Sequence, residues 1–250
     1  MKLFEIDIFW ITLAPTYYGL MYVLAFLFGI WYLKHTKRYT DKEREVLFLY
    51  SFLWVLLGGR IGYMIFYSFE SLRENFFTLF KVWEWWMSFH GWFLWVCVAL
   101  LFFSFQYHKN LWIVADDIAI IAPIGIFLGR IWNYLNKELL GFPYDGWLAV
   151  KTSEWSFFPS PLLEAFFEGI ILALILFFVQ KYKSFHWQIA VLFFIFYWLF
   201  RTFIELFVRT PDAHIWYHFW FLTQGSFLSI PMILAWVILY IHIRKKNAVT

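Results

Sequence analysis

The chain of 250 residues is 63% hydrophobic and 26% aromatic, and its formal net charge is only +3. A soluble domain is nearer ~45–50% apolar, so the composition excludes an ordinary soluble protein and indicates an all-α integral membrane protein. The basic residues cluster between apolar stretches, so we expect no nucleic-acid partner. Cys97 is the single cysteine, which excludes a disulfide framework.

Seven apolar stretches follow one another along the chain. A helix needs about 20 residues to cross the hydrocarbon core of a bilayer, and the stretches of that length are residues 11–33, 46–69, 87–107, 112–133, 161–180, 187–208 and 219–241. Arg60 interrupts the second stretch, and Glu164 and Glu168 lie in the first two turns of the fifth. The first residues, MKLFEID, lack a basic segment and a small-residue cleavage site, so we expect no removable signal peptide. The pattern predicts one membrane domain over residues 1–250.

The loop lysines and arginines divide unevenly between the two sides of this arrangement. One side has eleven: Lys34, Lys37, Arg38, Lys42, Arg44, Lys109, Lys181, Lys183, Arg244, Lys245 and Lys246. The other side has six: Lys2, Arg73, Lys81, Lys137, Lys151 and Arg209. Cytoplasmic loops carry the excess of Lys and Arg, so we predict a periplasmic N-terminus and a cytoplasmic C-terminus. The irregular residues 136–160 then form a short periplasmic head segment.

Polar residues from five of the predicted helices gather in the outer half of the bilayer. At ~1.5 Å per residue, Arg60 and Arg201 each lie roughly 21 Å from the cytoplasmic end of their helices. Arg130 lies higher, and His90 and Tyr18 lie about one turn below the outer edge. The inner half of the sequence pattern has no comparable set. We therefore predict a polar site that opens toward the outer leaflet.

Residues 129–141, GRIWNYLNKELLG, end the fourth apolar stretch with a group of polar side chains. Arg130, Asn133 and Lys137 are spaced i, i+3, i+7, so they can share one helix face. A charge beside a long apolar run is expensive in lipid and is a candidate for function. The alternative is that Arg130 extends to the lipid headgroups at an interfacial helix end. The residues alone leave both interpretations open.

His90 and a stripe on the sixth stretch are further candidates. An imidazole with a pKa near ~6.5 can accept a proton at neutral pH, whereas a structural His90 would bond a backbone carbonyl. Tyr197, Arg201 and Glu205 follow at i, i+4, i+8. Glu205 can hold Arg201 while Arg201 faces an anion, or the two can form a purely structural pair.

Other residues point to packing. Gly58, Gly59 and Gly62 surround Arg60, and small residues at this spacing let helices approach closely. For Arg60 itself we expect an internal ion pair. Asp116 and Asp117 stand near the start of the fourth stretch, where carboxylates favour the helix dipole, so we expect them to cap that helix. The sequence has no Cys or His cluster with metal-ligand spacing, and we expect no metal.

An ordered set of motifs adds to this pattern. They are YGLMYVLAFLFGIW at residues 18–31, GGRIGYMIFY at 58–67, MSFHG at 87–91, VADDIAIIAPIGIFLGR at 114–130, the stretch 129–141, PSPLLEAFFEG at 159–169, YWLFRTFIELFVRTPDA at 197–213 and LSIPM at 228–232. In this order the chain resembles the bacterial phosphatidylglycerol–prolipoprotein diacylglyceryl transferases over nearly its whole length. The family usually has glycine where Trp92, Trp132 and Lys137 stand.

The resemblance implies a function and a set of functional positions. Enzymes of this family move a diacylglyceryl group from phosphatidylglycerol to the lipobox cysteine of a prolipoprotein, in the bacterial inner membrane and without a cofactor. The implied positions are Tyr18, His90, Arg130, Asn133, Glu138, Gly141, Tyr197, Arg201 and Glu205. We expect His90, Arg130, Arg201, Tyr18 and Glu205 to be catalytic, and Arg60, Asn133, Glu138, Gly141 and Tyr197 to bind substrate. A non-catalytic lipid-binding relative, or a transferase with another acceptor, is the alternative. A transporter is a weaker one, since no inverted repeat is visible.

Overall fold

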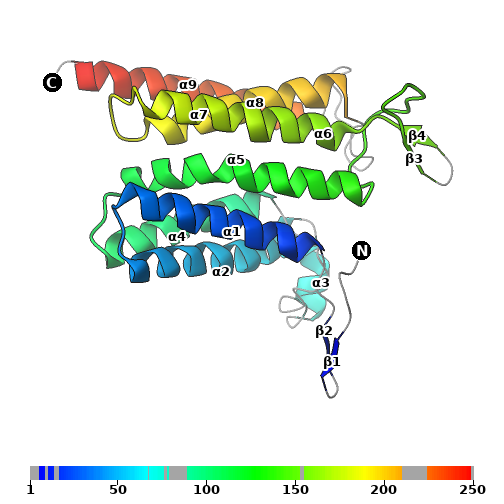
Figure 1. The fold of residues 1–250 in the computed structure, drawn as a ribbon, viewed down its shortest axis with the longest axis horizontal. Helices are drawn as coiled ribbons and strands as arrows, with labels where there is room; N and C mark the ends of the chain where they lie inside the picture. The colour runs from blue at the N-terminus through cyan, green and yellow to red at the C-terminus, as the bar shows by residue number, and fades with distance from the viewer. Residues whose placement is uncertain are drawn as a thin grey trace. The chain divides into compact units, whose positions relative to one another are not determined.

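The computed structural model describes residues 6–8, 11–13, 17–66, 68–75, 78, 89–152, 155–209 and 224–248 (Figure 1). The chain forms two compact units. The larger unit comprises Met1–Gly29 and Asp116–Thr250, and the smaller unit comprises Ile30–Ala115. Helices α1 (Tyr17–Thr36) and α5 (Leu111–Leu135) contribute residues to both.

The smaller unit is built on α2 (Asp41–Phe66), α3 (Phe69–Glu74) and α4 (Phe89–Gln106). Helix α2 begins at Asp41 rather than at the expected residue 46, because Thr40 and Glu43 form a capping box. The backbone N–H of Thr40 donates to Glu43 Oε2 at 2.7 Å, and the N–H of Glu43 donates to Thr40 Oγ1 at 3.3 Å. This reciprocal pair satisfies donors that the first turn leaves open and extends the helix into the charged loop.

Helices α2 and α4 pack side by side in the smaller unit. The rings of Trp54 and Trp95 stack with centroids 4.8 Å apart. A Cβ atom at Gly58 would collide with the Trp95 side chain, so the glycine leaves room for the tryptophan. The prediction that Gly58 serves close helix packing is confirmed.

The larger unit starts with a hairpin where the sequence predicted helix. Strand β1 (Ile6–Ile8) pairs antiparallel with β2 (Ile11–Leu13), and α1 begins only at Tyr17. The prediction of a helix from residue 11 is therefore wrong at its start. The β-branched residues of IDI and ITL favour an extended backbone, and apolar length alone does not distinguish strand from helix.

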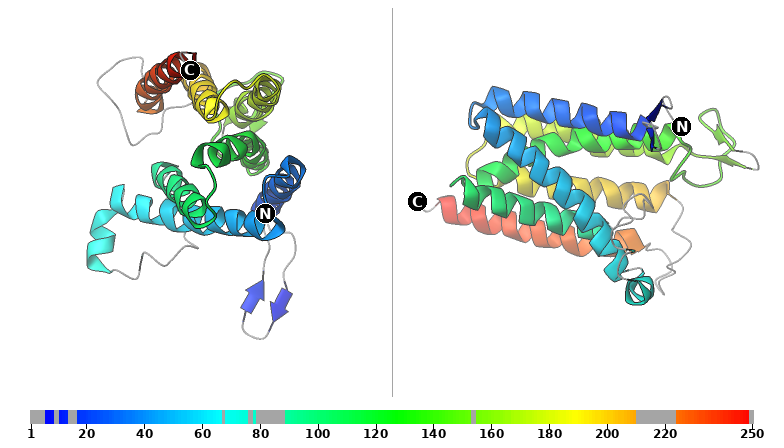
Figure 2. Two further views of the ribbon diagram at one scale, coloured as in Figure 1. Left: turned by 90° about the vertical axis from the view of Figure 1, so that its left-hand side faces the viewer. Right: turned by 90° about the horizontal axis from the view of Figure 1, so that it is seen from below.

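The rest of the larger unit is helical, apart from the head segment. After α5 come the short strands β3 (Val150–Lys151) and β4 (Ser156–Phe157). One continuous helix then passes through α6 (Ser160–Glu164), the π-helical segment η3 (Ala165–Ile171) and α7 (Leu172–Gln180). Helix α8 (Gln188–Phe207) lies beside both α7 and α9 (Gln224–Ala248) (Figures 1 and 2).

Asp116 caps a helix, but not the one on which it stands. Helix α5 already begins at Leu111, where the Asn110 side chain accepts from the N–H of Trp112 at 2.9 Å. Asp116 instead accepts the backbone N–H groups of Trp187 and Ala190 at 2.9 and 2.8 Å, at the start of α8. The predicted capping of its own helix is therefore wrong for Asp116, which favours the dipole of α8 instead because the start of α8 lies against this turn of α5.

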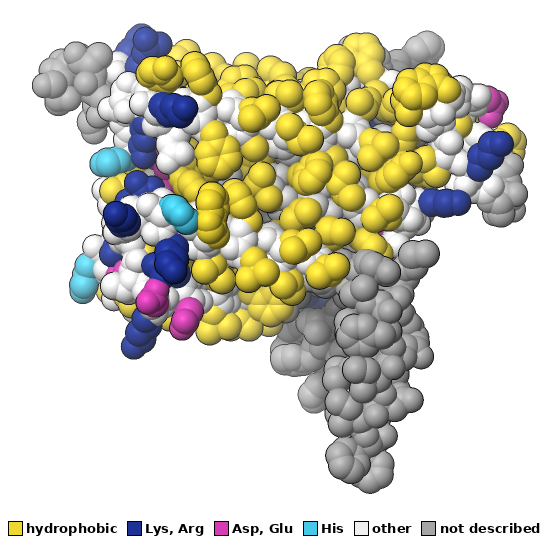
Figure 3. All heavy atoms as spheres, in the orientation of Figure 1, with side chains coloured by type: hydrophobic (Ala, Val, Ile, Leu, Met, Phe, Trp, Pro, Cys, Tyr) yellow, Lys and Arg dark blue, Asp and Glu magenta, His cyan; other side chains and the backbone are white. Residues whose placement is uncertain are grey.

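Several helices in the described part of the chain are long and apolar enough to cross a membrane. Four meet this criterion over Asp41–Met64, Leu111–Leu135, Ser160–Gln180 and Gln188–Phe207, and three shorter apolar helices cover Leu20–Thr36, Trp95–Gln106 and Ile230–His242. Large hydrophobic side chains such as Phe105, Leu174 and Phe178 are exposed on them. Figure 3 shows such side chains covering the helix surfaces, with Lys and Arg side chains mostly at the helix ends. The fold is that of an all-α membrane protein.

Candidate active site

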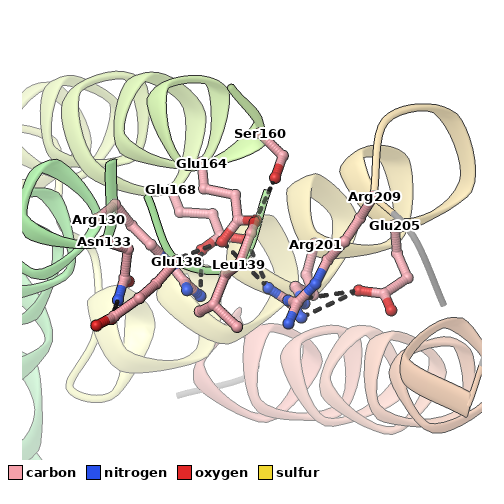
Figure 4. Close-up of polar contacts among 10 residues, drawn as sticks. All are labelled: Arg130, Asn133, Glu138, Leu139, Ser160, Glu164, Glu168, Arg201, Glu205 and Arg209. Carbon is pink, nitrogen blue, oxygen red and sulfur yellow. Dashed lines mark hydrogen bonds and ion pairs between the residues drawn. The ribbon is translucent and has the colours of Figure 1, made fainter. Parts of the chain in front are cut away.

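Two arginines of the larger unit meet on one pair of buried glutamates (Figure 4). Glu164 Oε2 lies 2.9 Å from Arg130 Nε and 3.4 Å from Arg201 Nη1. Glu168 completes the group, with Oε2 3.5 Å from Arg130 Nη2 and Oε1 3.9 Å from Arg201 Nη1. Arg130 therefore points toward the glutamates rather than ending as an isolated charge at an interfacial helix end. The structure brings together two of the predicted catalytic residues.

The helix that carries both glutamates contains a π-helical segment. Glu164 ends α6 and Glu168 lies in η3, one turn further on. Segments of π-helix are rare and often occur at functional sites. Both carboxylates are fully buried, which is costly for a charge unless it is paired. Arg130 and Arg201 supply that pairing.

Glu205 extends this group of ion pairs to a third arginine. Its Oε2 lies 3.0 Å from Arg201 Nη2 and 3.9 Å from Arg209 Nη1. The predicted pairing of Glu205 with Arg201 is confirmed. Three arginines and three glutamates balance in formal charge, and the donors of Arg201 are directed by carboxylates on two helices, α6–η3 and α8.

The end of α5 turns through a Schellman motif that positions Asn133 and Glu138. The N–H of Glu138 donates to the Asn133 carbonyl at 2.8 Å, and the N–H of Lys137 donates to the Tyr134 carbonyl at 3.0 Å. Lys137 occupies the left-handed position of this motif with φ 57°. Glycine is the residue that fits this conformation best. The turn brings Asn133 Nδ2 to 3.2 Å from Glu138 Oε2, and Asn136 Nδ2 to 3.1 Å from Glu138 Oε1.

Gly141 joins the head segment to the end of α8. It forms an antiparallel bridge with Arg209, and its N–H donates to the Phe158 carbonyl at 2.8 Å. A Cβ atom at Gly141 would collide with the Val208 carbonyl oxygen. Space, rather than an unusual backbone angle, therefore requires glycine here, since none of the described glycines has a positive φ. The Ser160 hydroxyl also donates to the Leu139 carbonyl at 2.7 Å and ties the same turn to the start of α6.

The remaining predicted residues divide into three cases. Tyr197 is buried on α8, one turn before Arg201, and its ring stacks on Phe193 with centroids 5.8 Å apart. Arg60 is buried in the smaller unit, where its Nη2 donates to the Thr78 carbonyl at 2.8 Å. Its expected ion pair stays a prediction. Tyr18 and His90 belong to α1 and α4, but their side chains lie outside the described part of the structure.

No role was predicted for Glu164 and Glu168 from the sequence. The signal was present, because two acids spaced i, i+4 in an otherwise uncharged apolar stretch are expensive in lipid and need partners. Their partners could not be read from spacing, since Glu164 and Arg201 are separated by 37 positions along the chain. Arg209 was counted only as a loop charge, whereas it is buried beside Glu205.

Residues 6–242 match the family model described as "Prolipoprotein diacylglyceryl transferase". The chain belongs to the prolipoprotein diacylglyceryl transferase family. It is 38% identical to the phosphatidylglycerol–prolipoprotein diacylglyceryl transferase of Hydrogenovibrio crunogenus, over 98% of this chain and 97% of that protein. It is 36% identical to the enzyme of that name from Buchnera aphidicola subsp. Acyrthosiphon pisum (strain 5A), over 94% and 95%. The corresponding protein of Blochmanniella floridana is 35% identical over 92% of each chain.

Most of the positions that the family resemblance implies lie in the larger unit with described side chains. They are Arg130, Asn133, Glu138, Gly141, Tyr197, Arg201 and Glu205. The ion pairs among the described residues use Nε and Nη2 of Arg130 and the two Nη atoms of Arg201. A guanidinium has five N–H donors, and the two side chains remain 17% and 15% exposed. The arrangement can therefore offer further donors to an anion.

Proposed function

We propose that this protein transfers the diacylglyceryl group of phosphatidylglycerol to the lipobox cysteine thiol of prolipoproteins and releases glycerol phosphate. One observation carries the proposal: a chain that matches this family over residues 6–242 brings Arg130 and Arg201 together on buried glutamates. The relatives' name gives both the lipid and the protein substrate.

The transfer reaction develops negative charge on a phosphate group, which the two arginines can stabilise. The acceptor sulfur attacks a glycerol carbon, so a carbon–sulfur bond forms and the bond from that carbon to a phosphate oxygen breaks. A phosphodiester monoanion thereby becomes a monoester that can carry a second negative charge. Arg130 and Arg201 stabilise this charge as it develops in the transition state, and the planar guanidinium suits phosphate oxygens.

The other proposed roles follow the same reaction. A free thiol has a pKa near ~8.5 and must lose its proton to become a good nucleophile, and His90 accepts that proton. Tyr18 contributes to catalysis, and Glu205 orients Arg201. The proposed substrate-binding residues are Arg60, Asn133, Glu138, Gly141 and Tyr197.

We place the protein in the bacterial inner membrane as one domain with seven transmembrane helices. The four long and three shorter apolar helices support this count. Lys109 Nζ donates to the Arg38 carbonyl at 3.0 Å and lies 3.1 Å from Glu43, which agrees with a shared cytoplasmic side for these two loops. Lys183 lies 2.6 Å from Asp116, near the start of α5, as the same orientation requires. The arginine cluster then faces the outer leaflet.

The test is a transfer assay with purified protein, phosphatidylglycerol and a lipobox peptide. We expect a thioether-linked diacylglyceryl peptide together with an equal amount of glycerol phosphate. A peptide with serine in place of the lipobox cysteine is the control, because a hydroxyl is far less acidic than a thiol and should give no product. Equal transfer to the serine peptide would contradict thiol chemistry, and no product in any lipid would favour the non-catalytic alternative.

A further inference from the structure

Glu164 and Glu168 hold the two arginines from the buried side. Among the described residues, their ion pairs all go to Arg130 and Arg201. The two carboxylates are 0% exposed, whereas the arginines keep 17% and 15% of their side chains exposed. The acids thus lie deeper than the bases. Figure 4 shows the glutamates reaching from one helix toward guanidinium groups that come from two others.

This arrangement answers an electrostatic difficulty. Two guanidinium groups that bind one phosphate must lie close together, and like charges repel strongly where water is scarce. A carboxylate oxygen shared between them, as Glu164 Oε2 is, offsets the repulsion and fixes the direction of both groups. The neighbouring Glu168 adds a second, longer bridge at 3.5 and 3.9 Å.

We propose that Glu164, supported by Glu168, is a positioning residue with two effects on the arginine pair. It orients Arg130 and Arg201 toward the phosphate, and it limits their attraction for anions so that the doubly charged product leaves. The proposal rests on the proposed function. With both acids present, Arg130, Arg201, Glu164 and Glu168 are neutral as a group. Loss of one acid leaves a net positive site that binds anions more tightly but directs them less well.

The experiment compares Glu164→Gln with the unchanged enzyme. Glutamine keeps the length and one oxygen acceptor but removes the charge. We expect kcat to fall by about 100-fold, as misplaced catalytic groups typically cause. At the same time KM for phosphatidylglycerol should fall, and glycerol phosphate should inhibit several-fold more strongly. Lower kcat together with tighter anion binding is a combination that a purely structural role would not produce.

Asp116→Asn is the matched control. Asp116 is another buried carboxylate of the larger unit, but it serves the start of α8 and Lys183 rather than the arginine pair. This variant should lose thermal stability while the folded protein keeps its kcat, KM and inhibition constant. The proposal is overturned if Glu164→Gln behaves like this control, with lower stability and unchanged KM and inhibition.

Two further measurements cover a variant that does not fold and an unchanged protein that transfers no lipid. If Glu164→Gln does not fold, Glu168→Gln replaces it, because its longer contacts make it the milder change; unchanged glycerol phosphate inhibition in that variant overturns the proposal. If the unchanged protein transfers no lipid, the proposed function fails, and thermal protection by glycerol phosphate is compared instead. Stronger protection of Glu164→Gln than of the unchanged protein supports the positioning role, and equal protection overturns it.

Discussion

Lys137 occupies a backbone position that its residue type disfavours. Its φ of 57° lies in the left-handed region, where a side chain meets the following carbonyl oxygen. The Schellman motif at the end of α5 requires this conformation, and Glu138 follows it directly. Among the described residues, the Lys137 side chain forms an exposed hydrogen bond, from Nζ to the Lys151 carbonyl at 2.8 Å. The turn that places Glu138 beside Asn133 therefore carries a conformational cost.

Lys137→Gly should stabilise the protein. Glycine removes the left-handed cost, which is about 1 kcal/mol for an ordinary residue. The measurement is the free energy of unfolding in detergent. Lys137→Ala is the control, since it also removes the Nζ hydrogen bond but keeps the strained backbone. A glycine variant no more stable than the alanine variant would show that the turn costs nothing at this position.

The close packing of η3 on α5 is the corresponding feature at the scale of elements. A Cβ atom at Gly169 in η3 would lie 2.6 Å from Phe127 Cβ and 2.9 Å from Phe127 Cα in α5. Real Cβ atoms do not approach this closely, so a glycine brings the helix with the acids next to the helix that carries Arg130. The π-helical winding of η3 lies in the same segment.

Gly169→Ala should therefore push the two helices apart and weaken the contact between Arg130 and Glu168. We expect a loss of about 1–3 kcal/mol in unfolding free energy, as for other overpacked sites, and reduced transfer activity. Gly129→Ala on α5 is the control, because, apart from its chain neighbours and its own helix backbone, no atom of the described residues lies within 4 Å of the added methyl group. That variant should keep its activity. Equal effects of the two substitutions would mean that the contact with Phe127 is unimportant.

At the scale of the molecule, the unequal distribution of loop charges predicts a definite orientation in the membrane. The head segment follows α5 and precedes α6, whereas α9 carries the basic residues Arg244 and Lys245 near its C-terminal end. Positive charges at the end of a helix also favour its dipole. Three predicted spans separate the head from the C-terminus, so the two should lie on opposite sides.

Cysteine labelling tests this orientation. The single Cys97 is first replaced by serine, and then Lys151→Cys or Lys245→Cys introduces one exposed thiol. A maleimide that cannot cross membranes should label the Lys151→Cys protein in intact spheroplasts. It should label the Lys245→Cys protein only after the membrane is opened. The reverse pattern would invert the predicted orientation. Labelling of both cysteine variants in intact spheroplasts would place the two positions on the same side, which contradicts three spans between them.

Features that depend on nearby residues could be predicted from the sequence. In the part of the chain that the structure describes, the long apolar stretches lie largely in helices, apart from residues 11–13, because the length of an apolar run is a local property. The pair Arg201–Glu205 was predictable because i, i+4 neighbours meet on any helix. Gly58 was predictable as a packing residue because a glycine on a helix leaves space for a side chain of another helix, and this holds whichever helix supplies that side chain.

Only the tertiary structure decided which distant groups share a buried charge. Asp116 lies 71 positions from Trp187, and its carboxylate accepts that residue's N–H instead of capping its own helix. Glu164 and Arg201 are in contact although they are 37 positions apart in the sequence. The hydrophobic periodicity of each helix does not show that these two helices pack against each other. A buried carboxylate needs a hydrogen-bond donor or a positive charge beside it. The sequence indicates that such a partner is needed but does not show which residue it is. The partner is decided by which helices pack together.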